Sequence, residues 1–309
     1  MNILVRKKKV VIHIVITLLF IIYLVSANLI FNRLILLKGE SKLVNEDFEF
    51  KNTIIMHSID SMDSIKIKWK NVLCIRGWAF LEDEDMKQSE KYLVLQSESS
   101  RFIYTVFPIK REDVKRIFEN SENLSLEKSG FRANIPIDVL KDGVYRIDIC
   151  IKKDNNVYLK QGKDFISKIN GRIIPKYISR NFSELLVDQA SDLGCFDDIK
   201  MCIDYIKDEE DDIIEISGWG FMEGVNADKS KIYTVFRSRE KTYIFDSQMR
   251  IREDVTNAFF EEYKMNLDSC GFNTNILKNQ IESGKYQIGI YIENGDKKAL
   301  VYTDKYYEK

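Results

Sequence analysis

The sequence predicts a mainly β protein: two tandem Ig-like β-sandwich modules, each with one short helix, after an N-terminal transmembrane helix. Three observations predict this arrangement. Residues 71–151 recur at residues 212–292, a constant spacing of 141. Short segments in both copies alternate between apolar and polar residues, as half-buried strands do, and a long apolar run precedes the first copy. A repeat this regular indicates two copies of one folded unit.

The chain begins with a basic cluster at residues 6–9 and continues with an uncharged, apolar run over residues 10–31. About twenty apolar residues suffice for a helix to cross a bilayer, and basic residues favour the cytoplasmic side. We therefore expect a cytoplasmic tail (1–9), a single-pass anchor in the cell membrane (10–31) and a juxtamembrane stalk (32–55), with the modules extracytoplasmic. The alternative is a signal peptide cleaved near Ala27, which would leave a secreted protein.

The length of 309 residues allows about two domains. The first module is expected at residues 56–168, a linker with a short helix at 169–195, and the second module at 196–309. The net charge of −1 conceals an acidic second module. That argues against nucleic-acid binding, because phosphate groups require clustered lysine and arginine.

Strands are predicted where an apolar side chain recurs at every second residue. Residues 145–151 follow this pattern, and the copy at 286–292 keeps the same apolar face. Further strands are predicted in three pairs of matched segments: 72–80 with 213–221, 92–96 with 233–237, and 102–107 with 243–247. Glycine-containing turns separate them.

Each module also contains the sequence Arg-Glu-Asp-Val, beginning at Arg111 and at Arg252, followed by apolar residues at helical spacing. We expect a short helix here, capped by Asp113 in the first module and by Asp254 in the second. Between the modules, residues 181–193 end before a glycine and predict a connecting helix.

A Gly-Trp pair stands near the end of a repeated strand, as Gly77-Trp78 and as Gly218-Trp219. Strand alternation puts Trp78 and Trp219 on the less buried face, where an indole ring could stack on a sugar. Alternatively, the glycine marks a bulge that turns the tryptophan inward, or the short helix covers it, since tryptophan is usually well buried. Both tryptophans are therefore candidate ligand-binding residues. The alternative is that they are buried and have a structural role.

Arg111 and Arg252 each stand two residues before an aspartate. Such a pair could bind an anionic or hydroxyl-rich ligand, or it could form an internal ion pair that holds a loop. Gly130 and Gly271, each followed by phenylalanine, complete the repeated pattern and are expected to have structural roles.

The sequence contains little that indicates catalysis. Its two histidines are His13, in the apolar run, and His57, before the aligned part of the first copy. No catalytic-serine, zinc-protease or phosphate-loop motif occurs, although a carboxylate pair for glycoside hydrolysis stays open on sequence alone. Neither a cofactor nor a metal site is expected, and a disulfide between Cys195 and Cys202 is left open.

The order Gly-Trp-x-Phe, Arg-x-Asp-Val, Gly-Phe and Gly-x-Tyr resembles β-sandwich modules found beside bacterial glycosyltransferases and other cell-surface polysaccharide enzymes. The resemblance covers most of residues 59–168 and 203–309, and it implies an accessory domain. We therefore expect a non-catalytic, membrane-anchored extracytoplasmic protein that binds glycan or cell-envelope polymer. The alternatives are a protein-interaction scaffold for a membrane or cell-envelope enzyme and, least favoured, a carboxylate-dependent hydrolase.

Overall fold

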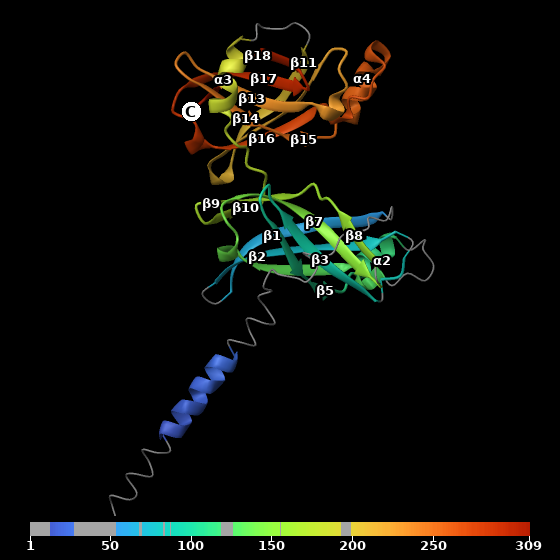
Figure 1. Ribbon diagram of the computed structural model, residues 1–309, viewed down its shortest axis with the longest axis vertical. Helices are drawn as coiled ribbons and strands as arrows, with labels where there is room; N and C mark the ends of the chain where they lie inside the picture. The colour runs from blue at the N-terminus through green and yellow to red at the C-terminus, as the bar shows by residue number, and fades with distance from the viewer. Residues whose placement is uncertain are drawn as a thin grey trace, which may run out of the picture. The chain divides into compact units, whose positions relative to one another are not determined.

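The computed structural model is mainly β, with antiparallel sheets and few helices, which confirms the predicted class of secondary structure (Figure 1). The structure describes residues 13–27, 54–67, 70–82, 84–86, 88–118, 126–154, 156–192 and 199–309. The chain divides into two compact units, Met1–Pro175 and Lys176–Lys309.

The helix described near the N-terminus covers residues 13–27. Among the described residues, no helix is both long enough and apolar enough to cross a membrane. The prediction of an anchor over residues 10–31, and of the location derived from it, is therefore wrong. The predicted tail (1–9) and most of the predicted stalk (32–53) lie outside the described residues.

The first unit contains two sheets. The first sheet has the order β1-β2-β6-β5, with β1 at Ile55–Ile67, β2 at Lys70–Leu81, β6 at Gly130–Pro136 and β5 at Phe107–Ile109. The second has the order β10-β9-β7-β3-β4, and β8 also pairs with β7. Its strands are β10 Arg172–Ile174, β9 Phe165–Ile169, β7 Gly143–Lys153, β3 Ser89–Gln96, β4 Arg101–Thr105 and β8 Asn156–Lys160.

One hydrophobic core joins these two sheets. Leu73 and Ile75 of β2 pack in the same cluster as Leu93 of β3 and Ile147 of β7, and all four side chains are at most 1% exposed. Because alternate residues of each strand point to opposite faces, one face of each sheet supplies the cluster. The arrangement is sandwich-like. Helix α2, Glu112–Ile117, follows β5.

The second unit repeats this arrangement. Its first sheet has the order β11-β12-β16-β15, with β11 at Ile199–Glu209, β12 at Ile213–Met222, β16 at Gly271–Leu277 and β15 at Gln248–Arg250. Its second sheet has the order β14-β13-β17-β18, with β14 at Thr242–Asp246, β13 at Lys231–Arg237, β17 at Lys285–Asn294 and β18 at Lys297–Glu308. Helix α4 is Glu253–Tyr263. Helix α3, Ser183–Asp192, confirms the helix predicted at 181–193.

The pairing registers of the two units match residue by residue. Ile149 of β7 pairs with Lys160, and Ile290 of β17 pairs with Val301, so both partners are shifted by 141. Strand β18 is one continuous strand, whereas its counterpart is interrupted and forms β8 and β9. The repeat seen in the sequence is therefore a repeat of topology and of register.

Candidate functional site

The repeated arginine makes the same contacts in both units. Arg111 donates from Nε to Asp113 Oδ1 at 2.8 Å and from Nη2 to Asp113 Oδ2 at 2.6 Å, while its Nη1 donates to Asp60. In the second unit Arg252 donates to Asp254 at 2.8 Å and 2.8 Å, and its Nη1 donates to Asp204 at 2.7 Å. We call each set the arginine cluster. Each guanidinium therefore bridges two carboxylates, in a fork geometry that suits arginine.

The predicted helix caps are wrong. Arg111 is the N-cap residue of α2 and Arg252 that of α4, and neither helix start has a side-chain capping bond. Asp113 and Asp254 lie in the first turn, where their carboxylates accept hydrogen bonds from the preceding arginine. A negative charge in a first turn is also favourable for the helix dipole.

Sequence reasoning missed the second carboxylate of each cluster. Asp60 and Asp204 are the extra residues of a β-bulge, because the pairing of β1 with β2 shifts between Ile59 and Ser61 and that of β11 with β12 shifts at the matching place. Their spacing is 144, not 141, since the hairpin of the second unit is shorter. The signal was an Ile-Asp pair in both first strands, Ile59-Asp60 and its later copy.

Charge pairing shifts the ionisation of these groups. The hydrogen bonds from Arg111 lower the pKa of Asp113 to about 2, and those from Arg252 lower the pKa of Asp254. The same hydrogen bonds raise the pKa of both arginines. Each arginine and the aspartate two residues after it thus stay charged in the ordinary pH range. An anion that binds either arginine must compete with the two carboxylates that the arginine already contacts.

The repeated glycines make room for the arginine clusters and for the hairpin. A Cβ atom at Gly130 would collide with the Arg111 side chain and with the carbonyl of Ile109, and Gly271 stands in the same relation to Arg252. Similarly, a Cβ at Gly77 or Gly218 would collide with a carbonyl of the neighbouring strand. These glycines permit close approach of backbone and side chains.

Both tryptophans pack beneath the short helix of their unit. Trp78 stacks on Phe80 with ring centroids 5.6 Å apart and contacts Phe118, at the end of α2, at 5.6 Å. Trp219 stacks on Phe221 at 6.0 Å and contacts Phe259 of α4 at 5.5 Å. Both indoles are half-buried. These aromatic contacts use part of the ring surface that the stacking hypothesis assigned to a sugar.

The cysteines contribute little to a site. Cys74, Cys150 and Cys270 are buried, and burial raises the pKa of the Cys150 thiol to about 12. Cys202 is exposed. Cys195, with which a disulfide was left open, lies outside the described residues.

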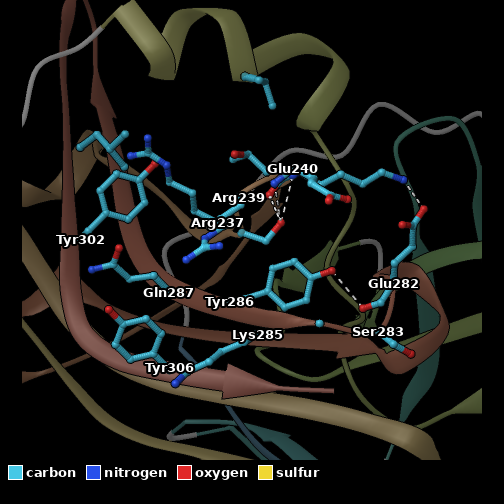
Figure 2. Close-up of a pocket in the computed structure, with 16 residues that line it drawn as sticks. Arg237, Arg239, Glu240, Glu282, Ser283, Lys285, Tyr286, Gln287, Tyr302 and Tyr306 are labelled. Carbon is cyan, nitrogen blue, oxygen red and sulfur yellow. Dashed lines mark hydrogen bonds and ion pairs between the residues drawn. The ribbon is translucent and has the colours of Figure 1, made fainter.

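A second candidate site is a groove on the second unit, where the hairpin between β13 and β14 meets the ends of β17 and β18 (Figure 2). We call it the sheet groove. Its volume is about 1110 Å³. Side chains that carry charge, amide or phenol groups line much of it: Arg237, Arg239, Glu240, Lys241, Glu282, Lys285, Tyr286, Gln287, Tyr302 and Tyr306. It has room for several ligand units in a row.

Two cations of the sheet groove lie over tyrosine rings. The Arg237 guanidinium is 5.0 Å from the centre of the Tyr302 ring, and the Lys285 ammonium is 4.9 Å from that of Tyr306. The two pairs lie along one wall of the groove, with Gln287 between them (Figure 2). Cation–π contact orients each cation without neutralising its charge.

The positive charges of the sheet groove are only partly compensated. Lys241 forms an ion pair with Glu282. Within the part of the chain that the structure describes, no carboxylate forms an ion pair with Arg237, Arg239 or Lys285. The groove therefore presents three cations to an incoming anion.

The same place in the first unit is built differently. Position 148 holds an aspartate, which accepts hydrogen bonds from Arg146 at 2.6 Å and 2.9 Å. Its counterpart is Gly289, where a Cβ would meet the Tyr302 ring at 2.8 Å. The first unit thus fills this region with an internal ion pair, whereas the second unit leaves room for a tyrosine. The sequence hypotheses looked for residues shared by both copies, and for that reason they missed the sheet groove.

No protein-family model matches the chain, and a search of curated proteins found no match either. The resemblance to modules of polysaccharide enzymes stays a prediction.

Proposed function

We propose that this protein is a non-catalytic binding protein whose second unit holds an anionic, hydroxyl-rich polymer, an acidic polysaccharide, in the sheet groove. The observation that carries the proposal is the pair of cation–tyrosine contacts, Arg237 over Tyr302 and Lys285 over Tyr306. Tyrosine offers a flat apolar face to a sugar ring and a hydroxyl to its polar edge, while the adjacent cation attracts a carboxylate or phosphate.

The composition of the groove supports binding over catalysis. Its two acidic residues are Glu240 and Glu282, and Glu282 is already paired with Lys241. An acid–base pair for hydrolysis needs carboxyl groups of different protonation state. The cations and phenols of the groove instead suit reversible recognition of a charged chain.

We also infer that the two units are Ig-like modules of one kind. Support comes from the matched strand orders and registers. Under this interpretation the residues shared by both units maintain the fold, and the residues that differ provide the ligand site. The tryptophans and arginines predicted from the sequence then have structural roles.

The test is binding of polygalacturonate, an acidic polysaccharide, to the full chain, with uncharged dextran as the comparison polymer. We expect polygalacturonate to bind and the affinity to fall as salt is added, because exposed charges are screened. The double variant Arg237→Ala/Lys285→Ala should weaken binding by at least about tenfold, since it removes two charged contacts. Arg250→Ala is the matched control, because Arg250 is an exposed arginine on β15 of the other sheet.

Unchanged binding in the double variant would contradict the proposal, as would equal binding of dextran. Binding of polyglutamate, an acidic polypeptide, in place of polygalacturonate would favour the protein-interaction scaffold and overturn the polysaccharide assignment. Isothermal titration calorimetry distinguishes these outcomes.

A further inference from the structure

The sheet groove contains two tyrosines that an irregular strand brings to one face of the sheet. Tyr302 and Tyr306 are four residues apart on β18, whereas their partners on β17, Gly289 and Gln287, are two residues apart. Strand β18 therefore carries a bulge between the tyrosines. Since Ile288 belongs to the core, its neighbours Gly289 and Gln287 point to the opposite, outer face, and the paired tyrosines share that face with them.

Hydrogen bonds of Thr303 hold the bulge in a defined shape. The Thr303 hydroxyl donates to the Ile288 carbonyl at 2.8 Å and accepts from the Lys305 N–H at 3.0 Å. The Thr303 carbonyl accepts from Gln287 Nε2 at 2.7 Å. Bulges of this kind re-aim side chains beside functional sites. Here the bulge fixes where the two tyrosines stand in the groove.

Each of these tyrosines has its own cation. The Arg237 guanidinium lies over the Tyr302 ring, and the Lys285 ammonium lies over the Tyr306 ring (Figure 2). We call the first pair the arginine subsite and the second the lysine subsite. Each subsite combines a positive charge with a phenol hydroxyl, a combination that suits a sugar bearing an acidic group.

The two subsites are a short step apart along the sheet. The β17 partners of their tyrosines are two residues apart, which corresponds to roughly 7 Å along a strand. A step this short favours acids on neighbouring units of a polymer over acids on alternate units. The third cation of the groove, Arg239, lies over no aromatic ring among the described residues, so it does not form a third subsite of the same kind.

The first unit has neither subsite. Gln96 stands at the position of Arg237, and Val144 stands at the position of Lys285. The strand that corresponds to β18 is interrupted between β8 and β9, at the place of the bulge. The subsites are therefore a feature of the second unit alone.

We propose that the sheet groove recognises two consecutive acidic sugars, one in the arginine subsite and one in the lysine subsite. The inference rests on the proposed function and narrows the class of ligand. The ligand is a polysaccharide that carries an acid on every unit, and polysaccharides whose acids alternate with neutral sugars are discriminated against. Joining two acids in one molecule makes the second contact intramolecular, so a dimer binds more tightly than a monomer.

Competition measures how many consecutive acidic sugars the groove needs. Fluorescein-labelled polygalacturonate is bound to the full chain and displaced by galacturonic acid, digalacturonate or trigalacturonate, with fluorescence anisotropy as the readout. Digalacturonate should displace it at a concentration at least about tenfold lower than galacturonic acid, and trigalacturonate should improve on digalacturonate by less than about threefold. Hyaluronan, whose acids alternate with neutral sugars, should require an at least about tenfold higher concentration of acid groups than unlabelled polygalacturonate.

Two single variants test the assignment of the subsites. Arg237→Ala leaves only the lysine subsite, and Lys285→Ala leaves only the arginine subsite. Each should reduce the advantage of digalacturonate over galacturonic acid to less than about threefold, because only one acid can then be held. Arg250→Ala, the matched control on the other sheet, should keep the full advantage.

Equal displacement by galacturonic acid and digalacturonate would overturn this inference and leave the proposed function in place, as would hyaluronan that competes as well as polygalacturonate. A full dimer advantage in either Arg237→Ala or Lys285→Ala would likewise show that the two subsites are not the ones used. If labelled polygalacturonate does not bind at all, the proposed function itself fails, and this inference fails with it.

Discussion

Arg111 and Arg252 have the same pattern of hydrogen bonds in two units whose surfaces have otherwise diverged. Each ties the bulge of a first strand to the start of a short helix, two segments about fifty residues apart in the chain. A lysine could not make this fork of parallel bonds, because its ammonium is a single point charge. The repeated Arg-x-Asp motif thus has a structural explanation: in each unit it connects the bulge of the first strand to the start of the short helix.

Asp113→Asn tests the cluster through pH. The folded-state pKa of Asp113 is about 2, below its ordinary value of 3.8. A depressed pKa contributes stability that is present above pH 3.8 and is lost as the pH falls through about 2. We therefore expect wild type to unfold at higher denaturant than Asp113→Asn near neutral pH, and the difference to vanish toward pH 2. Urea titrations followed by tryptophan fluorescence measure it.

The control for this pH series is Asp138→Asn, since Asp138 is exposed and lies outside the arginine cluster. A stability difference between wild type and Asp113→Asn that does not change with pH would mean that the ion pair is not its source.

Gly130→Ala tests the close approach of the strand to the Arg111 side chain. The added methyl group would meet the Arg111 stem and the Ile109 carbonyl, so the strand or the arginine must shift. We expect a loss of about 1–3 kcal/mol in the free energy of unfolding, as for other overpacked sites. Gly284→Ala is the comparison, because its nearest contact would be an ordinary 3.6 Å from the Tyr286 ring. Equal unfolding free energies for the two variants would contradict this account.

At the scale of elements, the sequence predicts best the strands in which burial alternates. The central strands β7 and β17 match the segments predicted at 145–151 and 286–292, each extended by a few residues. Strand β1 was not predicted, because as an edge strand it buries few side chains and shows little alternation. Its bulge was missed for the same reason. Strand β18 pairs with β17 on one side only and was missed as well.

At the scale of the whole molecule, the repeat made the strand topology predictable from the sequence. The sheet groove was not predictable in the same way, because it is built from residues that the two copies do not share. A residue present in both copies has a structural role in the fold. Gly77 and Gly130, for example, allow neighbouring atoms to approach closely. The sheet groove depends on residues that differ between the two units. The main difference is Gly289, which stands where the first unit has Asp148. The glycine leaves room for an aromatic ring where the first unit has an internal ion pair. No pattern in one sequence distinguishes such a change from neutral drift. Hydrophobicity over residues 10–31 likewise predicted a membrane span, whereas no helix among the described residues is long and apolar enough to form one.

The separate cores of the two units lead to a last prediction, that they resist unfolding independently. Ile75 and Ile216 occupy the same position in their units, and both are 0% exposed. Each belongs to a core whose described members all come from its own unit. We expect Ile75→Ala and Ile216→Ala each to lower the free energy of unfolding of their own unit by about 2–5 kcal/mol, through the lost burial and the cavity left behind.

Hydrogen exchange followed by mass spectrometry should place each loss of protection in the peptides of one unit. In the double variant each unit should show the loss measured in its single variant, within about 0.5 kcal/mol. Loss of protection in the second unit caused by Ile75→Ala would instead mean that the two repeats fold as one cooperative body.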